Sequence, residues 1–115
     1  MIIEVPSAAD PLIKIYNLDA FKSFFFQAMH PYVYSRKSFD ILCAKSGLEV
    51  VDVKYKQRYG LANHLKWLQE GLPGGNPIFE KVFSESTKKG YLSSLEEQGI
   101  TDTMYLFLKI DSRYM

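Results

Sequence analysis

The residues that could carry acid–base, nucleophilic or metal chemistry are two histidines, His30 and His64, and one cysteine, Cys43. An imidazole with a pKa near ~6.5 can act as a base or as a hydrogen-bond partner at neutral pH. His30 stands before a proline in a turn, where a structural hydrogen bond and a catalytic role are both compatible with the sequence. Tyr32 and Tyr34 alternate after it, a spacing that could wall a pocket. His30 is therefore the first candidate for a catalytic residue.

The other two side chains are weaker candidates. His64 falls on the polar side of a short amphipathic helix, and we expect it at the surface. Cys43 shares a helical stripe with Phe39 and Leu42, and a thiol buried among apolar neighbours is inert. Two histidines about 34 positions apart and one cysteine in the core do not make a metal-ligand set. We therefore expect no metal site and no cysteine nucleophile.

Composition narrows the class of protein further. The 115 residues are 47% hydrophobic, 15% aromatic and 23% charged, which fits one globular domain spanning 1–115 and excludes a disordered, collagen-like or coiled-coil chain. The net charge is +1 with both signs mixed along the chain, so nothing favours nucleic acid as a partner. No apolar run approaches the roughly 18 residues of a membrane span. The first stretch lacks the features of a signal peptide, and we expect a cytoplasmic protein.

Three segments have the residue pattern of β-strands. Ile2–Val5 is a short apolar run, and Glu49–Tyr59 alternates apolar and charged residues, with lysines that suit the edge of a sheet. Thr103–Ile110 is apolar on both faces, which indicates an interior strand. We expect an α/β fold whose last strand inserts between the first and the middle one.

Helical patterns fill the rest of the chain. Ser35 predicts the start of a helix that ends near Gly47, where a left-handed cap would lie. A longer helix is expected over Ile78–Gln98, with a possible break at Gly90. The run Phe24–Phe26 should be buried. A short amphipathic helix after position 60 carries an apolar stripe made of Leu61, Leu65 and Leu68.

Three segments, taken in order, resemble the C-terminal half of class I S-adenosylmethionine-dependent methyltransferases. They are IIEVPS at 2–7, HPYVYS at 30–35 leading into a helix, and SGLEVV at 46–51. In that family the fifth strand ends in Glu-Val-Pro-Asn or Ser, a histidine and aromatics precede a Ser-capped helix, and a Gly-Phe-x-Val turn opens the sixth strand. The resemblance implies part of a Rossmann-like fold with the strand order first, last, middle and the last strand antiparallel. Residues 60–98 correspond to a variable helical insertion between the last two strands.

The resemblance also implies a set of substrate-side residues. The segment after the fifth strand lines the substrate pocket of the family, which makes Ser7 and Asp10 candidates beside His30, Tyr32 and Tyr34. An alternative stays open for the first two, because Ser and Asp in a turn often bond to their own backbone or cap the following helix.

The family's cofactor site has no counterpart in the pattern. The family binds S-adenosylmethionine through a glycine-rich turn after its first strand and an acidic residue after its second. The clustered Gly74 and Gly75 lie instead in a proline-bounded loop without a preceding strand. We therefore expect the substrate-side portion of a methyltransferase that acts on a small molecule and binds no cofactor alone. Whether it is a natural truncation, the product of a split gene or an engineered piece stays open.

Two classes of function remain. The chain is part of an enzyme completed by a separate N-terminal half, or it is a non-enzymatic module, derived from that fold, that docks on a partner or self-associates. In either class we expect a second chain, and a homo-oligomer is one form of it, because the first strand leaves unpaired backbone groups at an edge.

Overall fold

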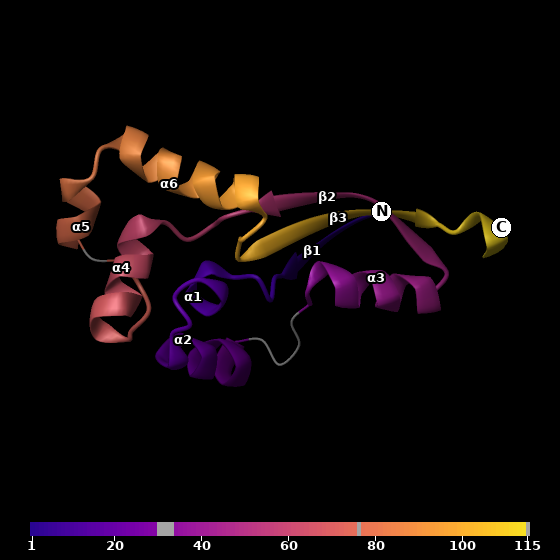
Figure 1. Cartoon of the computed structure of the whole chain (residues 1–115), viewed down its shortest axis with the longest axis horizontal. Helices are drawn as coiled ribbons and strands as arrows, with labels where there is room; N and C mark the ends of the chain where they lie inside the picture. The colour runs from indigo at the N-terminus through magenta and orange to yellow at the C-terminus, as the bar shows by residue number, and fades with distance from the viewer. Residues whose placement is uncertain (30–33, 76, 115) are drawn as a thin grey trace.

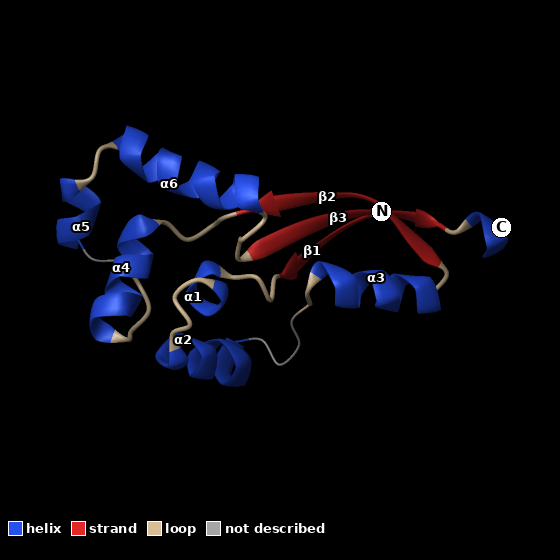
Figure 2. Ribbon diagram, viewed as in Figure 1, coloured by secondary structure: helices blue, strands red, loops and turns tan. Residues whose placement is uncertain are grey.

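The structure, a computed structural model, describes residues 1–29, 34–75 and 77–114. It is a mixed α/β protein with one small open sheet and helices gathered mostly at one end of it (Figure 2). The elements in chain order are β1 (Ile2–Pro6), α1 (Pro11–Lys14), α2 (Asp19–Ser23), the π-helix η1 (Phe24–Met29), α3 (Arg36–Lys45), β2 (Leu48–Lys56), α4 (Leu61–Glu70), α5 (Pro77–Val82), α6 (Glu85–Gln98), β3 (Thr103–Ile110) and the 3-10 turn η2 (Ser112–Tyr114).

The sheet has the order β1-β3-β2, and β3 runs antiparallel to both neighbours. The predicted order and the interior position of the last strand are confirmed. Leu106 is the centre of the sheet, opposite Ile3 on one side and Val53 on the other. Because β1 and β2 are each antiparallel to β3, they are parallel to each other. Their carboxyl ends therefore lie at the same edge, on the side of the molecule where α1, α2, α4 and α6 are found (Figure 1).

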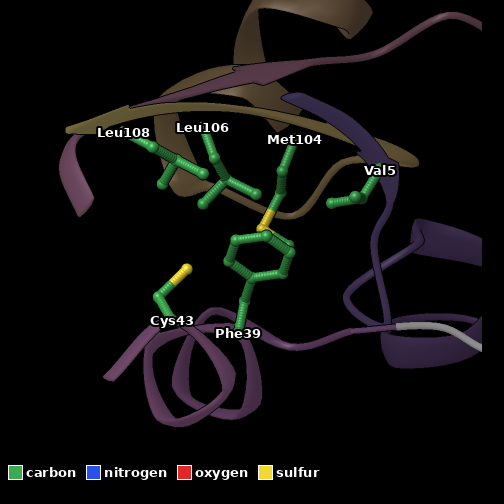
Figure 3. Packing of buried hydrophobic residues seen from close by; sticks show 6 residues of the cluster. All are labelled: Val5, Phe39, Cys43, Met104, Leu106 and Leu108. Carbon is green, nitrogen blue, oxygen red and sulfur yellow. The ribbon is translucent and has the colours of Figure 1, made fainter. Parts of the chain in front are cut away.

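The main hydrophobic core lies between one face of the sheet and α3 (Figure 3). Ser35 begins α3 with a capping box shared with Ser38, and Gly47 follows the helix with a φ of 74°, as the sequence predicted. Cys43 is buried in this core. Leu42 is exposed, so its expected place on the buried stripe is wrong. The buried members are Val5, Phe39, Cys43, Met104, Leu106 and Leu108.

A β-bulge in β2 corrects the predicted alternation of this strand. Val50 pairs with Leu108 and Asp52 pairs with Phe107, so Val51 is an extra residue with no partner of its own. A regular alternation would place Val51 on the same face as Val53, but Val51 is 52% exposed. Val50 takes its place against the core.

The helical region between β2 and β3 departs from the predicted pattern in two ways. The expected long helix is interrupted after α5, where Ser84 caps α6 through the N–H of Thr87, and it continues unbroken through Gly90. In α4 the buried side chains include His64 and Trp67, while Leu68 is 43% exposed. Polar and aromatic side chains of other elements bury this face of α4. The spacing of leucines along the helix could not predict these partners.

A second core joins α4 to the helices after β1. Trp67 packs edge-on against Phe21 at 5.1 Å between ring centroids, and Phe24 lies 5.3 Å away. Leu12 and Phe25 complete the cluster. Phe26 is partly exposed, so only part of the predicted Phe24–Phe26 run is buried. None of the helices described has the length and apolar character needed to cross a bilayer.

Candidate functional site

A cavity of about 400 Å³ opens at the carboxyl ends of β1 and β2, the edge of the sheet on which the helices gather. This is within the size range of sites for small molecules. Its walls come from the ends of all three strands, from α1, from the α2–η1 segment and from α4 with the loop that follows it. We call this cavity the strand-end pocket.

Asp102, at the start of β3, fixes the strand ends around the pocket. Its carboxylate accepts the backbone N–H of Arg58 at 3.0 Å, that of Tyr59 at 3.0 Å and the hydroxyl of Thr103 at 3.0 Å. Its own N–H donates to the side-chain oxygen of Gln57 at 2.9 Å. Burial raises the pKa of Asp102, while these donors act in the opposite direction. The carboxylate therefore ties the segment after β2 to β3.

His64 belongs to a chain of side-chain hydrogen bonds behind the pocket wall. The orientation of the Gln57 amide is set by two backbone groups, because its oxygen accepts the N–H of Asp102 and its nitrogen donates to the carbonyl of Tyr59. The same amide nitrogen lies 3.4 Å from His64 Nε2 and donates to this ring nitrogen. This places the ring proton on Nδ1, which donates to the hydroxyl of Tyr91 at 2.5 Å. The Tyr91 hydroxyl lies 2.9 Å from that of Tyr16. His64 is a neutral, positioned imidazole, and burial lowers its pKa to about 4.

The Asp10 carboxylate accepts fewer hydrogen bonds than that of Asp102 and can accept more from a ligand. It is 3% exposed, lines the pocket, and caps α1 by accepting the N–H of Leu12 at 2.9 Å. Burial is the main cause that raises its pKa to about 7, and the charge of Asp102 adds to it. A carboxyl group that titrates near neutrality can exchange a proton with a bound ligand.

Besides Asp10 and Asp102, the pocket is lined by one ion pair and by a set of aromatic side chains. Arg58 pairs with Glu4 and donates to the hydroxyl of Tyr105 at 2.9 Å, so its charge is compensated at the rim. The apolar wall is aromatic and includes Phe21, Phe24 and Trp67. A pocket built in this way can hold an apolar body and bind one polar group of a ligand.

Of the three substrate-side candidates in the described part of the chain, Asp10 alone lines the pocket. Ser7 is buried in a turn where its hydroxyl accepts the N–H of Ala9 at 3.1 Å. Tyr34 packs at 5.4 Å against the ring of Phe39 in the main core. His30 and Tyr32 lie outside the described residues.

The prediction for His64 is wrong, because its side chain is 1% exposed. The pattern failed because the partners of His64 come from the end of β2 and from α6. Sequence reasoning also missed Asp102 and Trp67 as pocket residues. One signal was available for Asp102, since an acidic residue directly before an apolar interior strand is unusual and needs a partner.

The clustered glycines and the His, Cys, Asp and Glu side chains of the described residues are the groups to compare with what a cofactor or a metal ion requires. Gly74 and Gly75 follow a helix and a proline, and the Gly74 carbonyl accepts the side-chain amide of Asn63 at 3.2 Å. A cradle for S-adenosylmethionine needs backbone N–H groups after a strand, so these residues do not fit it. Within residues 1–29, 34–75 and 77–114, no group of three or more His, Cys, Asp or Glu side chains converges on one point.

Comparison of the chain with protein-family models, with curated proteins and with solved structures gives no significant match.

Proposed function

We propose that this chain is the substrate side of an S-adenosylmethionine-dependent methyltransferase, and that the strand-end pocket holds the methyl acceptor. One observation carries the proposal. The last strand lies antiparallel between two strands that are parallel to each other, and the pocket opens where the two parallel strands end. In open α/β sheets, ligands bind outside the carboxyl ends of the strands.

The chemistry of the pocket agrees with this role. Methyl transfer depends on holding the acceptor in line and on excluding water more than on strong acid or base catalysis. The aromatic wall of the pocket supplies a dry surface, and Asp10 supplies one group that can orient a polar acceptor. The residues of this chain would bind and orient the acceptor. The cofactor would be held by a separate N-terminal half.

The test begins with the DNA upstream of this gene, read in every frame for a strand followed by a glycine-rich turn. If such a segment exists, the two polypeptides are expressed together and titrated with S-adenosylmethionine. We expect the joint protein to bind the cofactor and this chain alone not to bind it. Absence of such a segment, or a joint protein that fails to bind, would overturn the proposal.

The second candidate is a non-enzymatic docking or self-associating module, and the shape of the chain favours it. Its radius of gyration is 16.2 Å, against about 13 Å for a compact chain of this length. In the described sheet β1 has a neighbour on one side only, and Ile2 on this strand is 63% exposed. An edge of this kind is a site for pairing with another chain. The same surface would receive an N-terminal half, so the upstream DNA distinguishes the two candidates.

A further inference from the structure

The ligand class of the strand-end pocket can be inferred from the charges and rings of its walls. The apolar wall consists of Phe21, Phe24, Phe25 and Trp67, whose rings are packed into one cluster. Aromatic faces carry negative electrostatic potential and attract a cation that lies within about 6 Å of the ring centroid. Tyr59, which is 58% exposed, also lines the pocket.

The charged groups of the pocket sum to a negative charge. Among the described residues that line it, Glu4, Asp10 and Asp102 are acidic, and Arg58 is the one permanently charged cation. Arg58 is paired with Glu4, and His64 is neutral at pH 7 because its pKa is lowered to about 4. Of the two other carboxyl groups, Asp102 still interacts with the charge of Arg58, whereas Asp10 has no basic group among the causes that shift its pKa.

The two carboxyl groups are not equivalent toward a ligand. Asp102 accepts two backbone N–H groups and one hydroxyl, which occupy most of its acceptor positions. Within the described residues, the Asp10 carboxylate accepts one backbone N–H, that of Leu12. A buried carboxylate with so few donors gains most from a ligand that brings N–H groups and a positive charge.

We propose that the strand-end pocket binds an amine as its ammonium cation, with the ammonium group at Asp10 and the apolar body of the ligand against the aromatic wall around Trp67. An anionic ligand would meet two carboxyl groups, and a neutral ligand would leave the Asp10 carboxylate, which forms above about pH 7, without a positively charged partner. The inference rests on the proposed function, because it makes the amine the methyl acceptor. For that transfer the ammonium would first give a proton to the Asp10 carboxylate, and the freed nitrogen lone pair would form the new N–C bond as the S–C bond of the sulfonium breaks and leaves a thioether. The binding itself needs no cofactor and is measured on this chain alone.

Asp10 should also make the binding depend on pH. Because its pKa is raised to about 7, the ionised fraction of the Asp10 carboxyl group increases as the pH rises through neutrality. The titratable groups that face it across the pocket or through the adjoining wall are Glu4 of β1, Arg58 after β2, His64 of α4, Tyr91 of α6 and Asp102 at the start of β3. The pKa of His64, lowered to about 4, keeps this ring neutral between pH 6 and 8, and the raised pKa values of Arg58 and Tyr91 keep both groups protonated. Burial raises the pKa of Asp102 as well, so this group acts in the same direction as Asp10.

The test uses three probes of matched size: 2-phenylethylamine, 2-phenylethanol and phenylacetate. Trp67 is the single tryptophan of the chain and lines the pocket, so its fluorescence reports on binding. At pH 8 we expect the amine to bind about tenfold tighter than the alcohol, and the carboxylate to bind most weakly. Between about pH 5.5 and pH 8 the affinity for the amine should rise about tenfold, while that for the alcohol stays flat.

Two variants complete the design. Asp10→Asn keeps the shape of the side chain and an oxygen for the Leu12 N–H, and it should abolish both the preference for the amine and the pH dependence. Asp52→Asn removes an exposed carboxylate on β2, outside the pocket, and should change neither. Equal affinities for the three probes, no saturable binding up to about 10 mM, or a preference that survives in Asp10→Asn would each overturn the inference. Binding of the amine without methyl transfer by the joint protein would instead count against the proposed function.

Discussion

Replacing Asp10 by asparagine tests whether burial controls the charge of the pocket. The folded chain raises the pKa of Asp10 from 3.8 to about 7, so the folded state binds more protons than the unfolded state between these values. The stability from this group is therefore present at low pH and lost as the pH rises. Between pH 5 and pH 8 the loss amounts to about 2.6 kcal/mol.

His64 acts in the opposite direction over the same range. Burial lowers its pKa from 6.5 to about 4, so the unfolded state binds more protons between these values and stability rises with pH. The gain from pH 5 to pH 8 is about 2 kcal/mol. In the unchanged chain the two contributions nearly cancel. Asp10→Asn should therefore gain about 2 kcal/mol over this range, and His64→Gln should lose about 2.6 kcal/mol.

The assay is urea unfolding at pH 5, 6.5 and 8, followed by the fluorescence of the buried Trp67. Asp52→Asn serves as the control for removing an exposed carboxylate, and its pH profile should match that of the unchanged chain. The raised pKa of Asp102 also contributes to every profile, so the test compares the profiles of the variants with one another rather than their absolute slopes. Parallel pH profiles for the unchanged chain, Asp10→Asn and His64→Gln would refute the reasoning, because they would show that neither group changes its proton affinity on folding.

Further predictions concern stability, assembly and the cofactor. Gly90→Ala should raise the free energy of unfolding in urea melts by about 0.5–1 kcal/mol, because Gly90 is an exposed helical residue with open space around it. Gly99→Ala should lower the free energy of unfolding by about 1 kcal/mol or more, because Gly99 has a φ of 69° and faces the ring of Tyr55. Leu106→Ala, at the fully buried centre of the sheet, should cost about 2–5 kcal/mol by the same measurement. Light scattering should give a mass above 13.3 kDa, the mass of one chain. Ile2→Lys, at the edge of the sheet, should return the chain to a monomer, while Lys56→Glu should leave its assembly unchanged. A monomeric unchanged chain would contradict the predicted self-association. Calorimetric titration of the chain alone with S-adenosylmethionine should show no binding tighter than about 100 µM, roughly 5.5 kcal/mol.

Features of the fold that depend on neighbouring residues could be predicted from the sequence. The capped helix α3 was recognised from Ser35 and Gly47, because capping is a local hydrogen-bonding requirement. The interior position of β3 followed from apolar residues on both of its faces. The bulge at Val51 could not be predicted in this way, because an extra residue becomes visible only when the partner strand fixes the register.

The sequence by itself determined the α/β class and the interior position of the last strand. The family resemblance that it carries pointed to Asp10, in the turn after the first strand. Only the tertiary structure decided what surrounds that residue. His64 finds its partner Tyr91 27 positions along the chain, and Asp102 finds the N–H of Arg58 44 positions away. Burial, hydrogen-bond partners and pKa shifts depend on atoms that are distant in sequence and close in space, so the periodicity of a single helix or strand carries no information about them.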